Sequence, residues 1–446
     1  MLNHLLSLTL VVLSLSFGVY AQSGIQATSA AEKVAPLAEN ELDSDVRDFN
    51  LEELETRLSS VPVGPERDYF SGVTANRAGR YEESIHLLDR ALPLIPSNRP
   101  YRLKEAFYSL IYDYSNLYRY ADAFRIYGDL VKNFPGREKD DDYSLLKILQ
   151  SVPPQTISWN GPTRLKTEHS PLGSIDAELI VNGIKAPWLL DTGANHSVVS
   201  ASFAKLLGLQ PILGETHDQG GAASVEIRIR VGVLPALNVG GATLHNVVIE
   251  IMGDEALRMP LFDSQTGAQN GQYQIQAILG FPVLQALGMV TFTRDGELQA
   301  GSIVRQKPPV ARIFMNRLEP LIECGLDGRK VLFSLDTGAS GTALSDRFFR
   351  DFSSQFQNLK KADGTSAGAG GTIRREVYIL PEITLKVAGS DTTLHHVTVY
   401  PIPIGTDMDE NYGNIGRDLT SGFDSFTLDF TNMTLSLGRP VSSRLQ

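Results

Sequence analysis

The sequence predicts a multidomain protein in which an all-α region of helical repeats precedes an all-β region built from two similar lobes. Three observations carry this prediction. Residues 66–135 show a helical periodicity that recurs once. After residue 154 the composition changes to β-branched residues and glycine-containing turns, and the β region then repeats itself. The length of 446 residues allows about three domains.

Composition and charge exclude several classes of protein. Hydrophobic residues make up 42% of the chain, which is enough for real cores and excludes a wholly disordered or fibrous protein. The 40 Lys and Arg against 51 Asp and Glu give a net charge of −11, with no long basic run, so we expect no nucleic-acid partner. The single cysteine, Cys324, excludes an intrachain disulfide scaffold and a cysteine-based zinc site.

Residues 1–21 are predicted to be a signal peptide. Their apolar run, 5–18, is too short to span a bilayer comfortably, and it is followed by the small-x-small pattern Val19-Tyr20-Ala21. We therefore expect an exported protein, periplasmic or secreted, with no membrane contact after signal removal. Because the start of the chain is weakly charged, an uncleaved signal that anchors the protein is the alternative.

Residues 22–60 are rich in Ala, Glu, Asp and Ser, which predicts a linker, and residues 61–150 are predicted to form a helical domain. Its small, aromatic and proline positions recur, with Pro96 and Pro135 closing the two copies, and resemble a pair of tetratricopeptide (TPR) helix hairpins. Such a domain could bind a peptide or partner protein, or it could be a helical spacer or cover, because a repeat architecture specifies a shape and not a ligand.

The β region is predicted as two lobes, over residues 156–305 and 310–442. Each lobe contains a two-residue hairpin turn, an apolar strand, an Asp-Thr-Gly-Ala turn and a helix N-cap candidate at matching offsets. These are Asn182-Gly183, Asp191-Thr192-Gly193-Ala194 and Ser200 in the first copy, and Asp327-Gly328, Asp336-Thr337-Gly338-Ala339 and Ser345 in the second. So many matched offsets indicate an internal duplication.

The duplicated turns point to a pair of carboxylates. Since equivalent residues of a duplicated domain face each other across a pseudo-twofold axis, Asp191 and Asp336 are expected to converge on one site. Two carboxylates about 4 Å apart repel by roughly 4 kcal/mol at an effective dielectric of about 20, so the pair should share one proton. That state supplies a base and an acid together, and it requires no metal or cofactor.

These motifs resemble the retropepsin-like aspartic proteases, here with two lobes in one chain in the manner of pepsin. The resemblance covers about residues 160–440 and implies an all-β bilobal aspartic protease fold with aspartic endopeptidase activity. The roles that it implies are a catalytic pair, hydrogen bonds across the pseudo-twofold, backbone close to substrate, and packing behind the turns. Asp191 and Asp336 would be the catalytic pair, and Thr192 and Thr337 would make the hydrogen bonds across the pseudo-twofold. Gly193 and Gly338 would keep the backbone close to substrate, and Gly280 and Gly416 would pack behind the turns.

The sequence also departs from that family's pattern. Arg417-Asp418 is close to the retroviral form, in which the arginine pairs with an acid just after the catalytic turn, but Ser340 stands at that position, so the partner of Arg417 is open. In the first copy Phe281-Pro282 replaces the Arg-Asp pair. Alanine follows each Asp-Thr-Gly where acid-active pepsins carry Ser or Thr. The pKa values of the pair should therefore be raised, with activity at mildly acidic to near-neutral pH.

Substrate-covering flaps are expected in the glycine-rich segments 219–223 and 364–371, with Gly220, Gly221, Gly368 and Gly370 as their candidate binding residues. The polar insertion 254–276 of the first lobe could shape the cleft or serve as a processing loop. The histidines near the turns and at strand starts, His196, His245 and His395, are expected to be satisfied or at the surface rather than metal ligands.

We expect a peptide or protein substrate and a monomer. The alternative function is a non-catalytic peptide- or protein-binding module that uses the TPR-like repeats and a protease-like cleft. The presence of both aspartates favours catalysis, because a binding protein does not need two. Lobes that pair between two chains are a third possibility.

Overall fold

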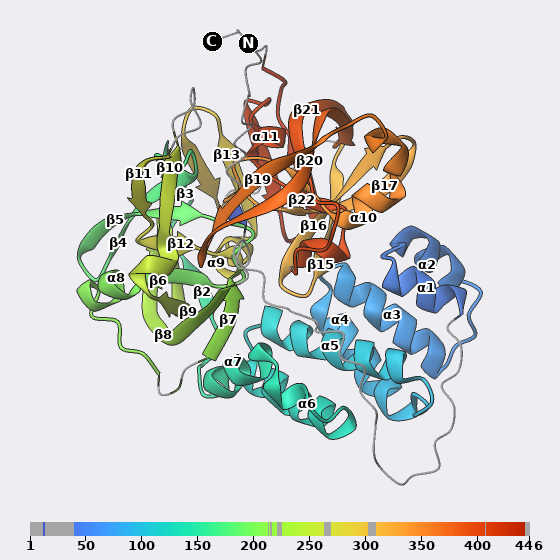
Figure 1. Ribbon diagram of the computed structural model, residues 1–446. Coiled ribbons are helices and arrows are strands. Elements are labelled where there is room, and N and C mark those ends of the chain that lie inside the picture. The colour runs from blue at the N-terminus through green and yellow to red at the C-terminus, as the bar shows by residue number, and fades with distance from the viewer. Residues whose placement is uncertain are drawn as a thin grey trace. The chain divides into compact units, whose positions relative to one another are not determined.

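The structure is a computed structural model that describes residues 12–13, 40–212, 214, 216–220, 225–262, 269–301, 309–405 and 407–441. The chain forms two compact units (Figure 1). The helical unit comprises Tyr20–Pro154 with Phe314–Leu318, and the β unit comprises Met1–Val19, Gln155–Ile313 and Glu319–Gln446. The predicted fold class, a helical region followed by a large bilobal β region, is confirmed.

The described part of the helical unit consists of residues 40–154 and 314–318. Its helices are α1 (Glu41–Arg47), α2 (Leu51–Leu58), α3 (Pro65–Arg77), α4 (Tyr81–Ala91), α5 (Pro100–Asn116), α6 (Tyr120–Asn133) and α7 (Asp141–Leu149). Consecutive helices pack as hairpins, with α3 against α4 and α5 against α6. The unit is therefore helical as predicted, and its assignment to the TPR repeat stays a prediction.

Two helices begin earlier than the sequence indicated. Helices α1 and α2 lie in the range expected as a linker. Asn40 caps α1 by accepting a hydrogen bond from the Asp43 backbone, and the Asp43 carboxylate accepts one from the Asn40 backbone in return. The same carboxylate, 1% exposed, is bound by Arg102 of α5 at 2.6 Å. This distant ion pair fixes α1, and composition alone could not show it.

The two lobes of the β unit repeat one topology. In the first lobe, the strands and short helices are β2 (Thr156–Trp159), β4 (Ile175–Val181), β5 (Ile184–Leu190), β6 (Ser197–Ser200), α8 (Ala201–Leu206), β7 (Thr216–Gly220), β8 (Val225–Val239), β9 (Ala242–Met252), β12 (Ala277–Leu279) and α9 (Phe281–Ala286). The second has β16 (Glu319–Leu326), β17 (Arg329–Leu335), β18 (Ala343–Leu344), α10 (Asp346–Asp351), β19 (Lys361–Gly368), β20 (Gly371–Val387), β21 (Ser390–Val399), β22 (Gly413–Ile415) and α11 (Arg417–Thr420).

Equivalent strands pair in equivalent ways. The β4–β5 hairpin corresponds to β16–β17, and each hairpin takes a short parallel neighbour, β12 beside β5 and β22 beside β17. The strand that follows each Asp-Thr-Gly turn also has a parallel partner, β9 beside β6 and β21 beside β18. The duplication read from the sequence is therefore a duplication of structure.

Local sequence explains the turns and the helix starts that frame each copy. Asn182 and Gly183 have φ of 49° and 79°, and Asp327 and Gly328 have φ of 49° and 76°. These left-handed values match two-residue hairpin turns, for which Asn-Gly and Asp-Gly are favoured. The predicted N-caps are confirmed as well, because Ser200 and Ser345 accept hydrogen bonds from the backbone of Phe203 and Phe348.

One antiparallel sheet joins the lobes within the β unit. Its strand order is β3 (Thr163–His169), β14 (Glu297–Ala300), β13 (Met289–Thr293), β23 (Ser425–Asp429), β24 (Thr434–Leu437) and β15 (Ala311–Asn316). Strands β13 and β23 come from different lobes and pair from Met289↔Asp429 to Thr293↔Ser425. Phe292 and Phe426 stack across this junction with ring centroids 4.7 Å apart. The lobes thus pair within one chain.

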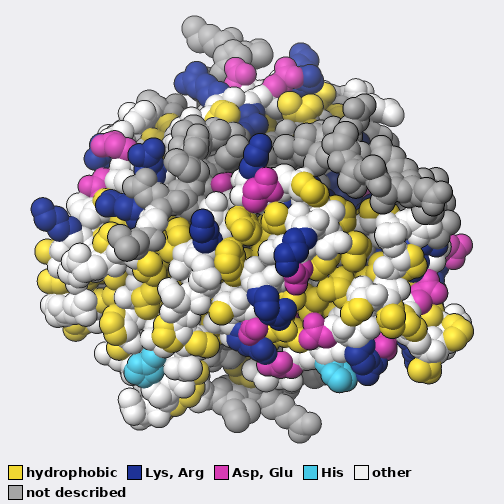
Figure 2. All heavy atoms as spheres, turned by 90° about the horizontal axis from the view of Figure 1, so that it is seen from below, with side chains coloured by type: hydrophobic (Ala, Val, Ile, Leu, Met, Phe, Trp, Pro, Cys, Tyr) yellow, Lys and Arg dark blue, Asp and Glu magenta, His cyan; other side chains and the backbone are white. Residues whose placement is uncertain are grey.

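The predicted signal peptide, residues 1–21, lies outside the described residues except for β1 (Val12–Leu13), which pairs in parallel with Ala367 and Gly368 of β19. Within the described ranges, no helix is long and apolar enough to cross a membrane. On the face shown in Figure 2, basic and acidic side chains are interspersed.

A glycine pair in the helical unit provides a matched stability test. A Cβ at Gly72 of α3 would lie 2.6 Å from Leu88 Cγ of α4, whereas a Cβ at Gly128 of α6 would meet no atom within 4 Å. Gly72→Ala should lower the free energy of unfolding, because overpacking costs about 1–3 kcal/mol and outweighs the helix propensity of Ala. Gly128→Ala should raise it by up to about 1 kcal/mol. Thermal unfolding followed by circular dichroism would check both; equal effects would contradict the close α3–α4 packing.

Candidate active site

The structure brings Asp191 and Asp336 together. Each aspartate follows an apolar strand, β5 or β17, and its backbone N–H donates to the short parallel neighbour, Asp191 to Leu279 O at 3.0 Å and Asp336 to Ile415 O at 3.0 Å. Their side chains hydrogen-bond to each other and are nearly closed to solvent, with residue exposures of 3% and 1%. Two residues 145 positions apart therefore form one buried carboxyl pair.

The threonines of the two turns hold the pair in place. Thr192 Oγ1 donates to Leu335 O at 2.6 Å and accepts from the Thr337 backbone N–H at 3.0 Å. Thr337 Oγ1 donates to Leu190 O at 2.8 Å and accepts from the Thr192 backbone N–H at 3.0 Å. All of these groups are buried. The four bonds tie one lobe's turn to the other in a symmetric arrangement, as the resemblance implied.

Gly338 is required by its close approach to the carboxyl pair. A Cβ at Gly338 would lie 2.6 Å from Asp191 Cγ, so only glycine fits beside the carboxyl pair. The N–H groups of Gly193 and Gly338 each donate to the Oδ1 of their own lobe's aspartate at 2.8 Å. Behind the turns, a Cβ at Gly280 would lie 2.3 Å from His196 O, and one at Gly416 would lie 2.7 Å from the Gly341 backbone.

The surroundings of the two aspartates differ. Asp336 Oδ1 accepts a further hydrogen bond from the Ala339 backbone at 2.9 Å, and its Oδ2 accepts one from Asn414 Nδ2 at 2.8 Å. Burial raises the pKa of Asp336, but these hydrogen bonds lower it in part. Burial, followed by the neighbouring charge of Asp336, raises the pKa of Asp191 well above its usual range. The additional donors at Asp336 therefore favour its charged form over that of Asp191.

Asn414 is a site residue that the sequence reasoning missed. It stands two residues before Gly416, at the position that Ile278 occupies before Gly280, and it is 1% exposed. Ser334 Oγ donates to Asn414 Oδ1 at 2.9 Å, which orients the amide toward Asp336. The available sequence signal for this residue was the polar Asn414 in the second copy at the position of the apolar Ile278 in the first.

The open question about Arg417 is answered by a backbone group. Its Nε donates to Ala339 O at 3.3 Å, and its backbone N–H donates to the same oxygen at 3.1 Å. Asp418 instead accepts from the Thr342 backbone and hydroxyl at 2.8 and 2.7 Å. In the first lobe the Phe281 backbone makes the equivalent bond to Ala194 O at 2.8 Å, so both copies hold the turn from the same side.

Three of the four glycines predicted to belong to flaps lie at or near the ends of two hairpins, and the fourth lies outside the described residues. Gly220 ends β7, which pairs with β8 as a hairpin, and Gly221 lies outside the described residues. Gly368 ends β19, which pairs with β20, and Gly370 forms the turn between them with φ of 89°. Hairpins therefore stand where flaps were expected, and their contact with a substrate stays a prediction.

The tip of the β19–β20 hairpin is seated on the first lobe. The Gly370 N–H donates to Ala256 O at 3.0 Å, and Ala369 is 6% exposed in a cluster with Ala194, Leu257 and Met259. Leu257 and Met259 belong to the insertion whose role the sequence left open; it forms a short helix (Asp254–Leu257), β10 (Arg258–Phe262) and β11 (Gln269–Gln274). The insertion thus helps to form the surface that covers the turn after Asp191.

The three histidines near the turns and strand starts have different surroundings. His196 is 6% exposed and its Nδ1 lies 3.3 Å from Glu250 Oε1, while His395 is exposed. His245 lies on β9. Among the described residues, no group of three or more His, Cys, Asp or Glu side chains is arranged to hold a metal ion.

Comparison with known proteins supports the interpretation of this geometry. Residues 177–283 and 322–419 match the family model described as aspartyl protease. Each matched segment contains one Asp-Thr-Gly turn and the apolar-Gly strand that packs behind it. The match therefore supports an aspartyl protease, a hydrolase, in the β unit. No curated protein matches the sequence.

The threonine bonds can be tested by an isosteric substitution. Thr192→Val leaves two buried backbone groups without partners, namely Leu335 O and the Thr337 N–H, and each costs about 1–3 kcal/mol. We expect a loss of about 2–5 kcal/mol in unfolding free energy, measured by denaturant or thermal unfolding. Thr192→Ser keeps the hydroxyl and is the control. A Val variant as stable as the Ser variant would show that the bonds do not hold the lobes together.

Proposed function

We propose that this protein is an aspartic endopeptidase that hydrolyses peptide bonds with a water molecule activated between Asp191 and Asp336. The observation that carries the proposal is the buried, mutually hydrogen-bonded carboxyl pair contributed by two equivalent turns. When such a pair shares one proton, its ionised member can act as a general base while its protonated member acts as a general acid.

The environment of each carboxyl group supports distinct roles. Asp336 is the ionised member, because Asn414 and two backbone N–H groups donate to it, and it takes a proton from water. Asp191 keeps the proton and donates it toward the carbonyl oxygen of the substrate. Attack of the water on the carbonyl carbon then forms a tetrahedral gem-diol. Asp336 passes its proton to the amide nitrogen, Asp191 takes a proton from a gem-diol hydroxyl, and the C–N bond breaks to give a carboxylic acid and an amine, which restores the starting state of the pair.

Loss of either carboxylate tests the proposal. Asp191→Asn and Asp336→Asn should each lower cleavage of a peptide library by about 10²–10⁴-fold or more, because general acid–base catalysis supplies that range. Asp391→Asn, which changes an exposed aspartate on β21, is the matched control and should cleave normally. Melting curves establish that each variant is folded. Undiminished cleavage by a folded Asp191→Asn protein would remove the pair from the mechanism, and absence of cleavage by the wild type would favour a binding protein.

The role of Asn414 predicts a change in the pH-rate profile. We expect the wild type to be most active at mildly acidic to near-neutral pH, with a lower limb set by ionisation of Asp336. Asn414→Ala removes a hydrogen bond that stabilises the charged form of Asp336, so the pKa of Asp336 rises and the lower limb moves to higher pH by about 1–2 units. Steady-state kcat/KM against pH measures the shift.

Asn414→Asp serves as a second probe, because another carboxylate beside Asp336 should move the lower limb further in the same direction. An unchanged lower limb in the Ala variant would contradict the assignment of Asp336 as the base. A wild-type optimum near about pH 2–3 would contradict the raised pKa values of the pair.

A further inference from the structure

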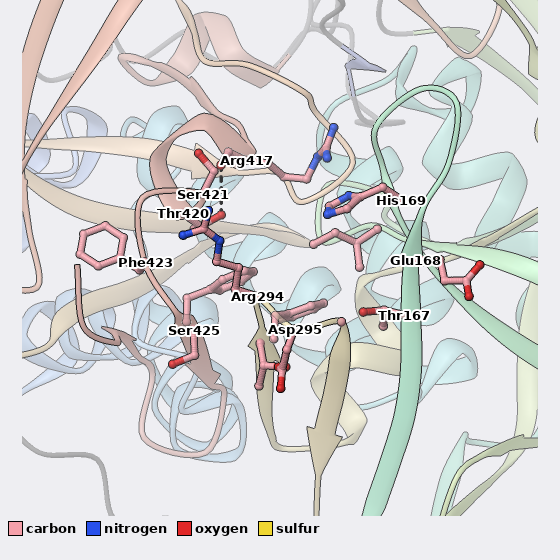
Figure 3. A pocket seen from close by; sticks show the side chains of 15 residues that line it. Thr167, Glu168, His169, Arg294, Asp295, Arg417, Thr420, Ser421, Phe423 and Ser425 are labelled. Atoms are coloured by element: carbon pink, nitrogen blue, oxygen red, sulfur yellow. Dashed lines mark hydrogen bonds between the residues drawn. The ribbon is translucent and has the colours of Figure 1, made fainter. Parts of the chain in front are cut away.

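A second concave site lies in the β unit, outside the catalytic turns and the flap hairpins. Its cavity has a volume of about 470 Å³ and opens between β3, the β13–β14 hairpin, α11 and β23 (Figure 3). This volume falls in the range of about 300–1,000 Å³ that small-molecule sites occupy. Neither Asp191 nor Asp336 lines it.

One wall of the cavity is aromatic. Phe292, Phe423 and Phe426 line it with exposures of 3%, 5% and 5%, and Ile175 contributes a further apolar surface. Phe292 and Phe426 are stacked, which makes this wall part of the sheet that joins the lobes. A planar apolar group can pack against such a surface with favourable burial and stacking.

The cavity is also lined by an arginine, Arg294, which is exposed. Arg294 stands at the end of β13, and its backbone N–H donates to Asp424 O at 2.9 Å. Its side chain makes no hydrogen bond or ion pair with any described residue. A guanidinium in a concave site has planar paired donors that match the two oxygens of a carboxylate.

A second arginine adds positive charge. The Nε of Arg417 donates to Ala339 O, and a Cβ at Gly173 would lie 3.3 Å from one of its terminal nitrogens. Figure 3 shows the Arg417 guanidinium turned toward His169.

Several acids lie near the two arginines. Glu168 is paired with Lys166 at 2.6 Å, and Figure 3 shows its carboxylate turned away from Arg294 and Arg417. Asp295 also lines the cavity, and Asp176, Asp336 and Asp418 are close enough to favour the charged form of Arg417. The cavity therefore combines an aromatic wall with one arginine, Arg294, whose side chain has no ion pair with a described residue.

We propose that this cavity is a second ligand site, which binds a carboxylate carried on an aromatic or similarly apolar group. Arg294 holds the carboxylate, and Phe423 and Phe426 pack against the ring. The site does not depend on the proposed proteolysis, because the residues that form it are not the catalytic pair.

The test is a calorimetric titration of the full-length protein with N-acetyl-phenylalanine, compared with N-acetyl-phenylalaninamide, which has the same ring and no carboxylate. The acid should bind and the amide should bind at least about tenfold more weakly. Arg294→Gln should weaken binding of the acid by about 10–100-fold, since a hydrogen-bonded charge pair is lost.

Two controls locate the site. Arg164→Gln removes an arginine on β3 that is paired with Glu297 outside the cavity, and it should leave the affinity unchanged. Asp191→Asn should also leave it unchanged, which separates this site from the proposed cleft. The proposal is overturned if the acid does not bind, if acid and amide bind equally, or if a folded Arg294→Gln protein binds as the wild type does.

Discussion

The contact between the two Asp-Thr-Gly turns is the constraint on which the site depends. Thr192 and Thr337 exchange four hydrogen bonds with buried backbone groups of the opposite turn. Leaving any one of these groups unpaired would cost about 1–3 kcal/mol, so the lobes are held in one registration. That registration buries Asp191 against Asp336 and makes the pair compete for one proton. The sheet through β13 and β23 supports it by pairing strands of the two lobes directly.

The two lobes place their aspartates at the ends of equivalent strands, but the residues around the two aspartates differ and give them different hydrogen-bond partners. In the first lobe, Leu189 and Ile278 are buried in an apolar cluster. Their equivalents in the second lobe are Ser334 and Asn414, which are hydrogen-bonded to each other. The polar pair delivers an amide donor to Asp336, while no equivalent side chain reaches Asp191 from Ile278. Burial raises both pKa values, and the hydrogen bond from Asn414 offsets part of that rise at Asp336.

Equivalent positions of the two lobes also carry different residues outside the catalytic turns. The first lobe carries the insertion that includes Leu257 and Met259, and the hairpin tip of the second lobe packs on it through Ala369. On the other side of the catalytic turns, Arg417 bonds the turn of its own lobe and also lines the second cavity, where the first lobe has Phe281, packed on Phe430. Divergence after duplication has therefore produced both the cover of one site and the lining of another.

The sequence by itself determined the features that depend on local conformation and on repetition. The turns at Asn182 and Asp327, the N-caps Ser200 and Ser345, the two lobes and the convergence of their Asp-Thr-Gly turns all follow from backbone preference and matched spacing. Tertiary structure alone decided which carboxyl group receives additional hydrogen-bond donors, what Arg417 binds, where the hairpin tip rests and that α1 folds onto α5 through Asp43 and Arg102. The reason is physical, because desolvation and hydrogen bonds between residues far apart in the chain arise only once the chain is packed, and no local pattern encodes them.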